Sequence, residues 1–349
     1  MNSLIAALSK VAHGWCESGS QQSRVDDAVR ATLEAPNQFT YEAMAFAIDQ
    51  QMSEITESAL HEWIQGRRPK KPHIVGVINA GNIPFAGLQD LLAILLCGHT
   101  YLGVLSRKSP YLLPAFVDSI RSEGLNLDAD FVEPDEVWER AESVIATGGD
   151  EAIAQIRSLA SAKGIPSQRC LFRSNRFGVA ILDGYETAND WENLALDVLL
   201  HEGMGCRNVA LIFAPEGLEP DDCLHHLAKI RSLFPPHPST PGRLTIPQAY
   251  LAAINQAHAY GDGLEFLISK GEPEAQVPGH VRWVGYKDFD EMIVLVEGLY
   301  KEIQCIVARE SIHTMLPKGW SVQPLGMTQR PALDWQPDGV DTIDFLCNL

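Results

Sequence analysis

The spacing of hydrophobic residues changes near residue 70 and divides the chain into two regions of different character. Up to about residue 66 the pattern is helical. Residues 41–65 carry apolar side chains near helical spacing, at Ala43, Phe46, Ala47, Met52, Ile55, Ala59, Leu60 and Trp63. A basic linker broken by prolines follows at 66–72. The sequence therefore predicts an N-terminal helical segment joined to a body of a different kind.

Beyond the linker, short β-branched or aliphatic runs alternate with longer segments of helical spacing. The first run, 73–78, is nearly all apolar, as expected of a strand that is buried on both faces. Alternation of strands with helices predicts a parallel, doubly wound α/β sheet. The predicted strands are 73–78, 101–105, 129–132 and 143–146, and the predicted helices are 88–97, 111–121 and 150–162.

A second β/α region begins near residue 170. Its predicted strands are 177–182, 209–213, 280–284 and 304–307, and its predicted helices are 191–201, 221–233, 247–258 and 289–299. From residue 323 the chain is rich in Pro and Gly, so this tail must pack on the body to be ordered. We predict an α/β fold of two domains, 1–172 and 173–325, with residues 326–349 packing back as a tail.

Composition and charge narrow the possible functions. The 349 residues are 46% hydrophobic and carry a net charge of −18. This balance excludes a disordered chain, and an acidic surface argues against nucleic-acid or membrane-surface binding. The longest apolar run, 91–97, is shorter than the about 20 residues that span a bilayer. Seven scattered cysteines without a C-x-x-C pair, and an N-terminus unlike a signal peptide, predict a cytoplasmic protein with free thiols and no metal site.

Two turns carry candidate catalytic residues. In Gly81-Asn82-Ile83-Pro84, after the first buried strand, the amide of Asn82 can face a developing oxyanion, or it can simply stabilise its own turn. In Gly203-Met204-Gly205-Cys206-Arg207, the glycines would let a ligand approach Cys206 closely. Arg207 could favour the thiolate and His201 could act as a base. The alternative for Cys206 is a buried structural cysteine.

Two further segments are candidates for binding phosphates or a cofactor. Thr147-Gly148-Gly149 joins a strand to a helix, where free N–H groups suit a phosphate or a nicotinamide edge. A plain helix start explains this segment equally well, and the G-x-G-x-x-G fingerprint is absent. The basic clusters near βα junctions are Arg67/Arg68/Lys70/Lys71, Arg107/Lys108 and Arg169/Arg173/Arg176, and each could equally be a solvated loop.

Taken in order, six motifs resemble one family. They are Gly81-Asn82-Ile83-Pro84, Leu105-Ser106-Arg107-Lys108, Ile145-Ala146-Thr147-Gly148-Gly149, Val179-Ala180-Ile181-Leu182-Asp183-Gly184, Gly203-Met204-Gly205-Cys206-Arg207-Asn208-Val209 and Asp338-Gly339-Val340-Asp341-Thr342. Over residues 70–349 the chain resembles the LuxC-like acyl-CoA reductases, a branch of the aldehyde dehydrogenase superfamily.

The resemblance implies two domains. Residues 1–172, including the N-terminal helices, would form a Rossmann-like nicotinamide cofactor domain, and residues 173–325 would form the catalytic domain that carries the cysteine. It implies that Cys206 is the nucleophile, that Asn82 is the oxyanion-hole residue, and that the turn at Thr147, Gly148 and Gly149 contacts the cofactor. The implied reaction is reduction of an acyl-CoA, of the fatty acyl class, to the aldehyde by NADPH or NADH.

Some positions depart from the superfamily pattern. Val104 stands where related chains carry a Lys, and Met204 replaces a Gln. The stretch 173–176, Arg-Ser-Asn-Arg, stands where aldehyde dehydrogenases place a general-base Glu, so the acyl-enzyme should resist hydrolysis. Its arginines could instead hold phosphates. If a base exists elsewhere, the candidates are Glu202, Glu186 and Asp183.

The loop after the second strand bears on the choice of cofactor. No acidic residue follows that strand to bind a ribose 2′-hydroxyl. Ser106, Arg107 and Lys108 stand there instead and can meet a 2′-phosphate, which favours NADPH.

Two other function classes remain open at the level of sequence. One is a weakly active or inactive relative that serves as a binding or assembly subunit. The other is a cysteine acyltransferase that uses Cys206 without hydride chemistry. The expected partners are a small-molecule acyl-CoA substrate and either further copies of this chain or an acyl-activating enzyme.

Overall fold

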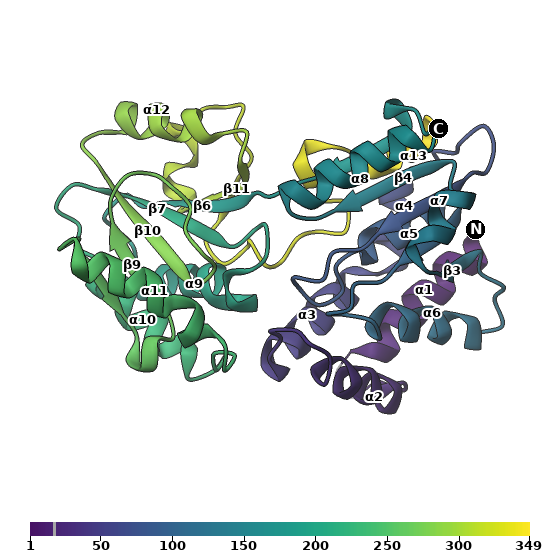
Figure 1. The fold of residues 1–349 in the computed structure, drawn as a ribbon, viewed down its shortest axis with the longest axis horizontal. Helices are drawn as coiled ribbons and strands as arrows, with labels where there is room; N and C mark the ends of the chain where they lie inside the picture. Colours follow the sequence, from purple (N-terminus) through teal and green to yellow (C-terminus); the bar gives the residue numbers. More distant parts are fainter. Residues whose placement is uncertain (17–18) are drawn as a thin grey trace. The chain divides into compact units, whose positions relative to one another are not determined.

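The computed structural model describes residues 1–16 and 19–349, and the chain divides into two compact units (Figure 1). Unit 1 comprises Met1–Asn37, Met44–Asn175 and Ala332–Leu349. Unit 2 comprises Gln38–Ala43 and Arg176–Pro331. Each unit contains one mainly parallel sheet with helices, so the predicted α/β fold class is confirmed.

The N-terminal segment is helical, as its hydrophobic spacing predicts. It forms α1 (Asn2–Trp15), α2 (Gln22–Leu33), α3 (Tyr41–Glu54) and α4 (Glu57–Ile64). The helical pattern over 41–65 is thus two helices. They separate because Thr56 has an extended backbone and its hydroxyl accepts a hydrogen bond from Ala59 N at 3.2 Å, which starts a new helix.

The sheet of unit 1 has five parallel strands in the order β3-β2-β1-β4-β5. The strands are β1 (Ile74–Ile78), β2 (Thr100–Val104), β3 (Ala129–Phe131), β4 (Ser143–Thr147) and β5 (Cys170–Arg173). Four helices connect them: α5 (Leu88–Cys97), α6 (Leu112–Ser122), α7 (Pro134–Arg140) and α8 (Asp150–Ala162). Of these four connecting helices, the sequence pattern did not predict the short helix α7.

The strand order of this sheet reverses between β1 and β4. From β1 the chain moves outward to β2 and β3, and it then crosses back to β4 on the other side of β1. The connections leaving the two central strands therefore diverge at their carboxyl ends. Ligands of open α/β sheets bind at such a switch point.

A C-terminal helix, α13 (Thr342–Cys347), belongs to unit 1 and packs against α5. The Arg173 guanidinium is buried there, between Asp90 of α5 (2.8 and 2.9 Å) and the Thr342 hydroxyl (2.9 Å). This buried ion pair fixes both helices to the end of β5.

Unit 2 is built on a seven-stranded sheet in the order β12-β11-β6-β7-β10-β9-β8, of which only β8 is antiparallel to its neighbour. The strands are β6 (Phe177–Ile181), β7 (Val209–Pro215), β8 (His258–Tyr260), β9 (Leu267–Lys270), β10 (His280–Tyr286), β11 (Ile303–Ala308) and β12 (Val322–Pro324). The helices are α9 (Ala188–Leu199), α10 (Asp221–Arg231), α11 (Thr240–Ala253) and α12 (Phe289–Leu299).

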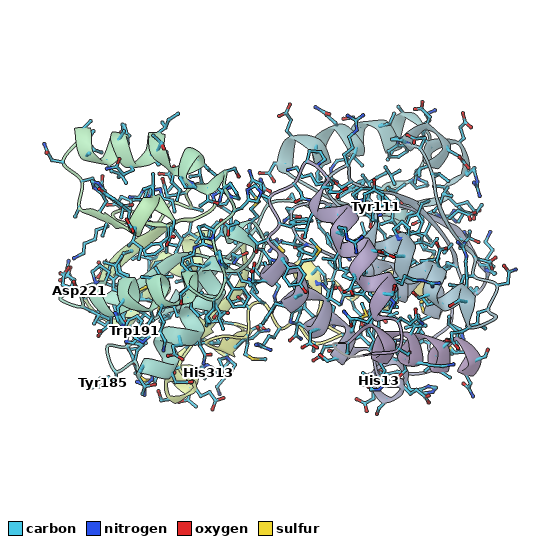
Figure 2. The ribbon with its side chains drawn as sticks, turned by 90° about the horizontal axis from the view of Figure 1, so that it is seen from below. His13, Tyr111, Tyr185, Trp191, Asp221 and His313 are labelled. Carbon is cyan, nitrogen blue, oxygen red and sulfur yellow. The ribbon has the colours of Figure 1, made fainter. Side chains whose placement is uncertain are left out.

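The core of unit 2 lies on both faces of this sheet. Trp191 of α9 packs into the cluster on one face, whereas Tyr185, in the loop before α9, is exposed (Figure 2). The predicted start of α11 at residue 247 is wrong. The helix begins at Thr240, because Pro241 occupies its first turn and Pro247 lies inside it.

Among residues 1–16 and 19–349, no helix has the length and apolar character needed to cross a bilayer.

Candidate active site

The turn that carries Cys206 follows α9 and precedes β7. Three consecutive residues, His201 (φ 55°), Glu202 (φ 59°) and Gly203 (φ 71°), have left-handed backbone conformations. A non-glycine residue in this region costs about 1–2 kcal/mol, so the surrounding structure must hold His201 and Glu202 in place. A Cβ at Gly203 would also lie 2.8 Å from Gly279 N, so only glycine fits there.

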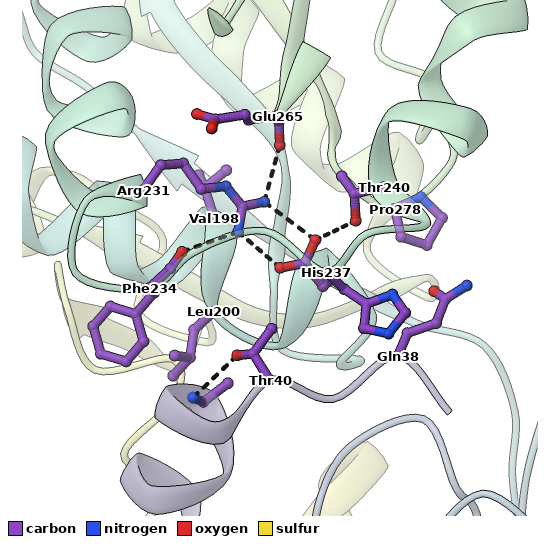
Figure 3. A network of polar contacts seen from close by, with 12 residues as sticks. Gln38, Thr40, Val198, Leu200, Arg231, Phe234, His237, Thr240, Glu265 and Pro278 are labelled. Atoms are coloured by element: carbon purple, nitrogen blue, oxygen red, sulfur yellow. Dashed lines mark hydrogen bonds and ion pairs between the residues drawn. The ribbon is translucent and has the colours of Figure 1, made fainter. Parts of the chain in front are cut away.

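A buried ionic network holds this left-handed turn (Figure 3). The Glu202 carboxylate accepts hydrogen bonds from Arg231, with Nη1 to Oε1 at 2.7 Å and Nη2 to Oε2 at 3.4 Å. It also accepts one from the Thr240 hydroxyl, and Arg243 Nη2 lies 3.8 Å from Oε2. The side chains of Glu202 and Arg231 are only 5% and 2% exposed, so this pair is shielded from water.

Asn208 holds the other end of the turn. Its Oδ1 accepts a hydrogen bond from Gly205 N at 2.8 Å. Its Nδ2 donates to the carbonyl oxygens of Asp197, Val198 and Leu200 at 3.0, 3.2 and 2.8 Å. One buried amide thus fixes the backbone just before Cys206 against the last turn of α9.

Arg207 lies buried beside Cys206 and binds the segment that follows β11. Its Nε donates to Thr328 O, and its Nη2 donates to Gln323 Oε1 at 3.0 Å and to Met327 O at 3.2 Å. Burial lowers the pKa of the Arg207 guanidinium, and electrostatic interactions with Cys305, Cys206 and Asp197 oppose that shift. Arg207 therefore supplies positive charge near Cys206 while its hydrogen bonds serve the structure.

Asp197 of α9 binds the same segment after β11 that Arg207 binds. Its carboxylate accepts bonds from Gly326 N at 2.6 Å, Thr328 N at 3.0 Å and the Thr328 hydroxyl at 2.7 Å. Burial raises the pKa of Asp197 to about 6. Through Asp197 and Arg207, the chain around residues 323–328 is fastened to the Cys206 turn.

Of the three carboxylates considered as general bases, Asp183 and Glu186 lie at the opposite edge of the unit 2 sheet from Cys206. β6 and β7 are parallel, with Gly178 opposite Val209 and Ile181 opposite Phe213. Cys206 precedes β7, whereas Asp183 and Glu186 follow β6, so a strand length of about 16 Å separates the two edges. Asp183 instead pairs with Arg309 at 2.9 Å.

The remaining candidate bases are His201 and Glu202. Glu202 lies at the same edge as Cys206, but its carboxylate is bound by Arg231 and Thr240. His201 is buried, and burial lowers its pKa to about 4, so the ring is neutral at pH 7. Its Nδ1 has no hydrogen-bond partner within the part of the chain that the structure describes.

Asn82 lies in unit 1, in the loop that leaves β1. The neighbouring Asn79 holds this loop: its N donates to Val104 O at 3.1 Å, and its Nδ2 donates to the Tyr101 hydroxyl at 2.9 Å and to Val104 O at 3.0 Å. Asn82 itself is partly exposed. The sequence places Asn79 in the turn but gives no sign that this residue, rather than Asn82, fastens β1 to β2.

The loop after β2 packs against the loop after β1. A Cβ at Gly81 would lie 2.0 Å from Ser106 Oγ, so glycine is required for this contact. Ser106 Oγ accepts a hydrogen bond from Lys108 N at 3.3 Å. The side chains of Arg107 and Lys108 are exposed, and neither forms an ion pair with any residue of 1–16 or 19–349. Their positive charges are therefore available to a ligand.

The turn after β4 places two glycines beside the N-terminus of α8. Gly148 N donates to Arg173 O at 3.1 Å, and Gly149 is the N-cap of α8. A Cβ at Gly148 or Gly149 would meet its nearest neighbours at ordinary distances of 3.6 and 3.8 Å, so the protein itself does not require glycine here. Small residues beside a helix N-terminus leave space for a phosphate or a flat ring.

All the predicted unit 1 residues therefore gather at one edge of its sheet. Ile78 lies opposite both Val104 and Ala146, so the loops that follow β1, β2 and β4 leave the sheet side by side. These loops carry Asn82, then Ser106, Arg107 and Lys108, then Thr147, Gly148 and Gly149. Cys206 lies in unit 2.

The expectation that Arg173 and Arg176 hold phosphates is wrong for Arg173. Its guanidinium is 7% exposed and forms the buried ion pair with Asp90. Arg176 donates from Nη1 to Ile303 O at 3.2 Å. The partner of Arg173 lies 83 residues away in sequence, so no local pattern could reveal the pair. Among the described residues, no group of three or more His, Cys, Asp or Glu side chains could hold a metal ion.

No family model and no curated protein matches this sequence. Solved structures do match. The NAD+ complex of an aldehyde dehydrogenase from Mycobacterium tuberculosis has a TM-score of 0.67 at 13% identity, covering 92% of this chain and 77% of that one. This chain has the aldehyde dehydrogenase fold.

Two further structures agree with that fold. An oxidoreductase from Marinobacter aquaeolei has a TM-score of 0.74 at 11% identity, covering 98% of this chain and 80% of that one. Succinic semialdehyde dehydrogenase from Streptococcus pyogenes, in complex with NADP+, has a TM-score of 0.67 at 12% identity, covering 93% and 81%.

Proposed function

We propose that this protein is a nicotinamide-dependent, acylating oxidoreductase that reduces an acyl-CoA thioester to the aldehyde through an acyl-Cys206 intermediate. The observation that carries the proposal is the Cys206 turn. Its backbone is held in a strained conformation by Glu202 on one side and Asn208 on the other. Such buried polar structure around a partly exposed thiol is typical of a nucleophile that must be positioned accurately.

The edge of the unit 1 sheet fits a nicotinamide dinucleotide. Thr147, Gly148 and Gly149 leave room for it beside the N-terminus of α8, and the exposed charges of Arg107 and Lys108 suit a 2′-phosphate. Similar folds have been solved with NAD+ and with NADP+. The bound reduced cofactor would supply hydride.

The protein's own residues would perform the acyl transfer. The Cys206 thiolate attacks the thioester carbonyl carbon and forms a new C–S bond, while the carbonyl oxygen becomes an oxyanion. The side-chain amide of Asn82 and the backbone N–H of Cys206 donate hydrogen bonds to that oxygen. The oxyanion then collapses and the CoA thiolate leaves, so that the acyl group is held on Cys206.

The environment of the carboxylates supports acyl transfer to CoA over hydrolysis. Water attack on a thioester needs a base within hydrogen-bond reach. Asp183 and Glu186 follow β6 at the opposite edge of the sheet, and the Glu202 carboxylate is bound by Arg231. A protein built in this way retains its acyl-enzyme until hydride or CoA arrives.

The test is oxidation of NADPH and NADH against a series of acyl-CoAs, with intact-mass detection of acyl-Cys206. We expect cofactor oxidation, and we expect Cys206→Ser to abolish both signals while Cys170→Ser, which alters another partly exposed thiol, retains them. Acylation without cofactor oxidation would instead identify a cysteine acyltransferase. Neither signal with any acyl-CoA would indicate a binding or assembly subunit and would refute the proposal.

A further inference from the structure

We propose that Cys97 and Cys347 are a peroxide-oxidisable thiol pair that forms a disulfide between α5 and α13. The two Sγ atoms lie 3.9 Å apart, although the residues are 250 positions apart in sequence. Cys97 is the last residue of α5, and Cys347 is the last residue of α13. This pair is independent of the proposed Cys206 chemistry.

The surrounding contacts hold the two thiols together. His99 Nε2 lies 3.0 Å from Leu346 O, and Arg67 Nη1 binds Asp341 at 2.9 Å, so contacts at both ends of α13 fix it within unit 1. A disulfide needs the sulfurs to approach to about 2.0 Å. Cys347 is the last residue of a six-residue helix, so the remaining approach would come from rotation of its side chain and a shift of that helix end.

Solvent and charge both reach the pair. Cys347 is partly exposed, whereas Cys97 is buried. Cys97 also lines a cavity of about 350 Å³ together with Arg68, Lys70 and Lys71, which is large enough for peroxide. Burial raises the pKa of both thiols, and the guanidinium groups of Arg67 and Arg68 oppose that rise. The net shift still disfavours the thiolate that oxidation requires, so the pair should react slowly at neutral pH and faster as the pH rises.

The reaction balances with hydrogen peroxide as the oxidant. The more exposed Cys347 thiolate attacks one peroxide oxygen, the O–O bond breaks, and hydroxide leaves, which gives a sulfenic acid. Cys97 then loses its proton and attacks that sulfur, the S–S bond forms, and the S–O bond breaks with loss of a second hydroxide. With the two released protons, the products are one disulfide and two waters.

The disulfide would close a very long loop and so stabilise unit 1, to which both helices belong. Constraining the unfolded chain in this way is typically a stabilising change, which we expect to raise the thermal midpoint by about 5–10 °C.

The experiment treats the reduced full-length Cys206→Ser protein with hydrogen peroxide, so that the proposed nucleophile does not compete. We expect the intact mass to fall by two hydrogen atoms, a peptide pair joining Cys97 to Cys347, a higher melting temperature, and reversal by dithiothreitol. Adding Cys347→Ser should abolish all four results, whereas Cys170→Ser should change none of them. A different peptide pair, or oxidation to sulfinic acid at either cysteine without a crosslink, would overturn the proposal.

Discussion

The left-handed turn before Cys206 depends on the charge of Glu202, and Glu202→Gln tests this dependence. The substitution keeps the size and shape of the side chain. It removes the negative charge that lies 2.7 Å from the Arg231 guanidinium. It also replaces one of the two acceptor oxygens by an NH2 group, so the Thr240 hydroxyl and the two Arg231 N–H donors are left with one acceptor oxygen. The Arg231 side chain, 2% exposed, is then a buried charge without its compensating partner.

Breaking a buried ion pair from one side costs about 3–5 kcal/mol, because the remaining charge stays desolvated. For a cooperative unit of this size, about 2–4 °C per kcal/mol gives a fall in melting temperature of about 6–20 °C. Relaxation of His201 and Glu202 from the left-handed region would also release about 1–2 kcal/mol of strain at each residue. We therefore expect the Cys206 turn to rearrange and kcat to fall by about 10²-fold, the cost of misplacing a reacting group by about 1 Å.

The assay compares melting temperature, kcat and the alkylation rate of Cys206 in Glu202→Gln with the same quantities in Glu192→Gln. Glu192 pairs with Lys229 at the protein surface, so its loss should change none of them measurably. A second variant, Glu202→Gln with Arg231→Met, removes both charges and should recover much of the lost stability. If Glu202→Gln behaves like Glu192→Gln, the ionic network does not hold the turn.

Four further outcomes are expected. Asn82→Ala should lower kcat by about 10²-fold with little change in KM, and an effect on KM alone would reduce Asn82 to a turn residue. Arg107→Ala with Lys108→Ala should erase a preference for NADPH over NADH, measured as the ratio of kcat/KM values; a wild-type preference for NADH would contradict this role. Burial lowers the pKa of His201 to about 4, whereas the pKa in the unfolded chain is about 6.5. The free energy of unfolding should therefore decrease as the pH falls from 6.5 to 4, and the loss at pH 5 should be about 2 kcal/mol. Asn tolerates a positive φ, so the His201→Asn variant should keep this turn. Its free energy of unfolding, measured by denaturant titration, should lose the part of the dependence on pH between about 6.5 and about 4 that comes from the proton of His201. Aldehyde with oxidised cofactor should turn over only with CoA, and steady release of free acid without CoA would reveal a base near Cys206.

The sequence predicts the regular parts of the fold because their signals are local. The helix at Leu88–Cys97 ends at Gly98, and the strand at Ile74–Ile78 is a continuous apolar run, so each can be identified within a short window. The strand-end loops of unit 1 follow from the same alternation, because parallel strands bring their carboxyl ends to one edge.

The parts that the sequence could not predict depend on distant partners. Glu202 binds Arg231 and Thr240, which lie 29 and 38 residues further along, and its positive φ follows from that burial rather than from its own preference. Asp183 is a plausible base on sequence alone, and only the pairing of β6 with β7 shows that it lies at the other edge of the sheet.

The helix α13 has a consequence for synthesis on the ribosome. Unit 1 contains most of the first 175 residues, but its buried Asp90–Arg173–Thr342 contact requires residue 342. The apolar surface of α5 that α13 covers therefore stays open while the whole of Arg176–Pro331 is translated. Unit 2 takes no residue after Pro331, so all residues of its core are synthesised before α13. Unit 1, which begins first, is therefore the last unit to have all of its residues, and apolar surface that is exposed during such an interval is prone to aggregation.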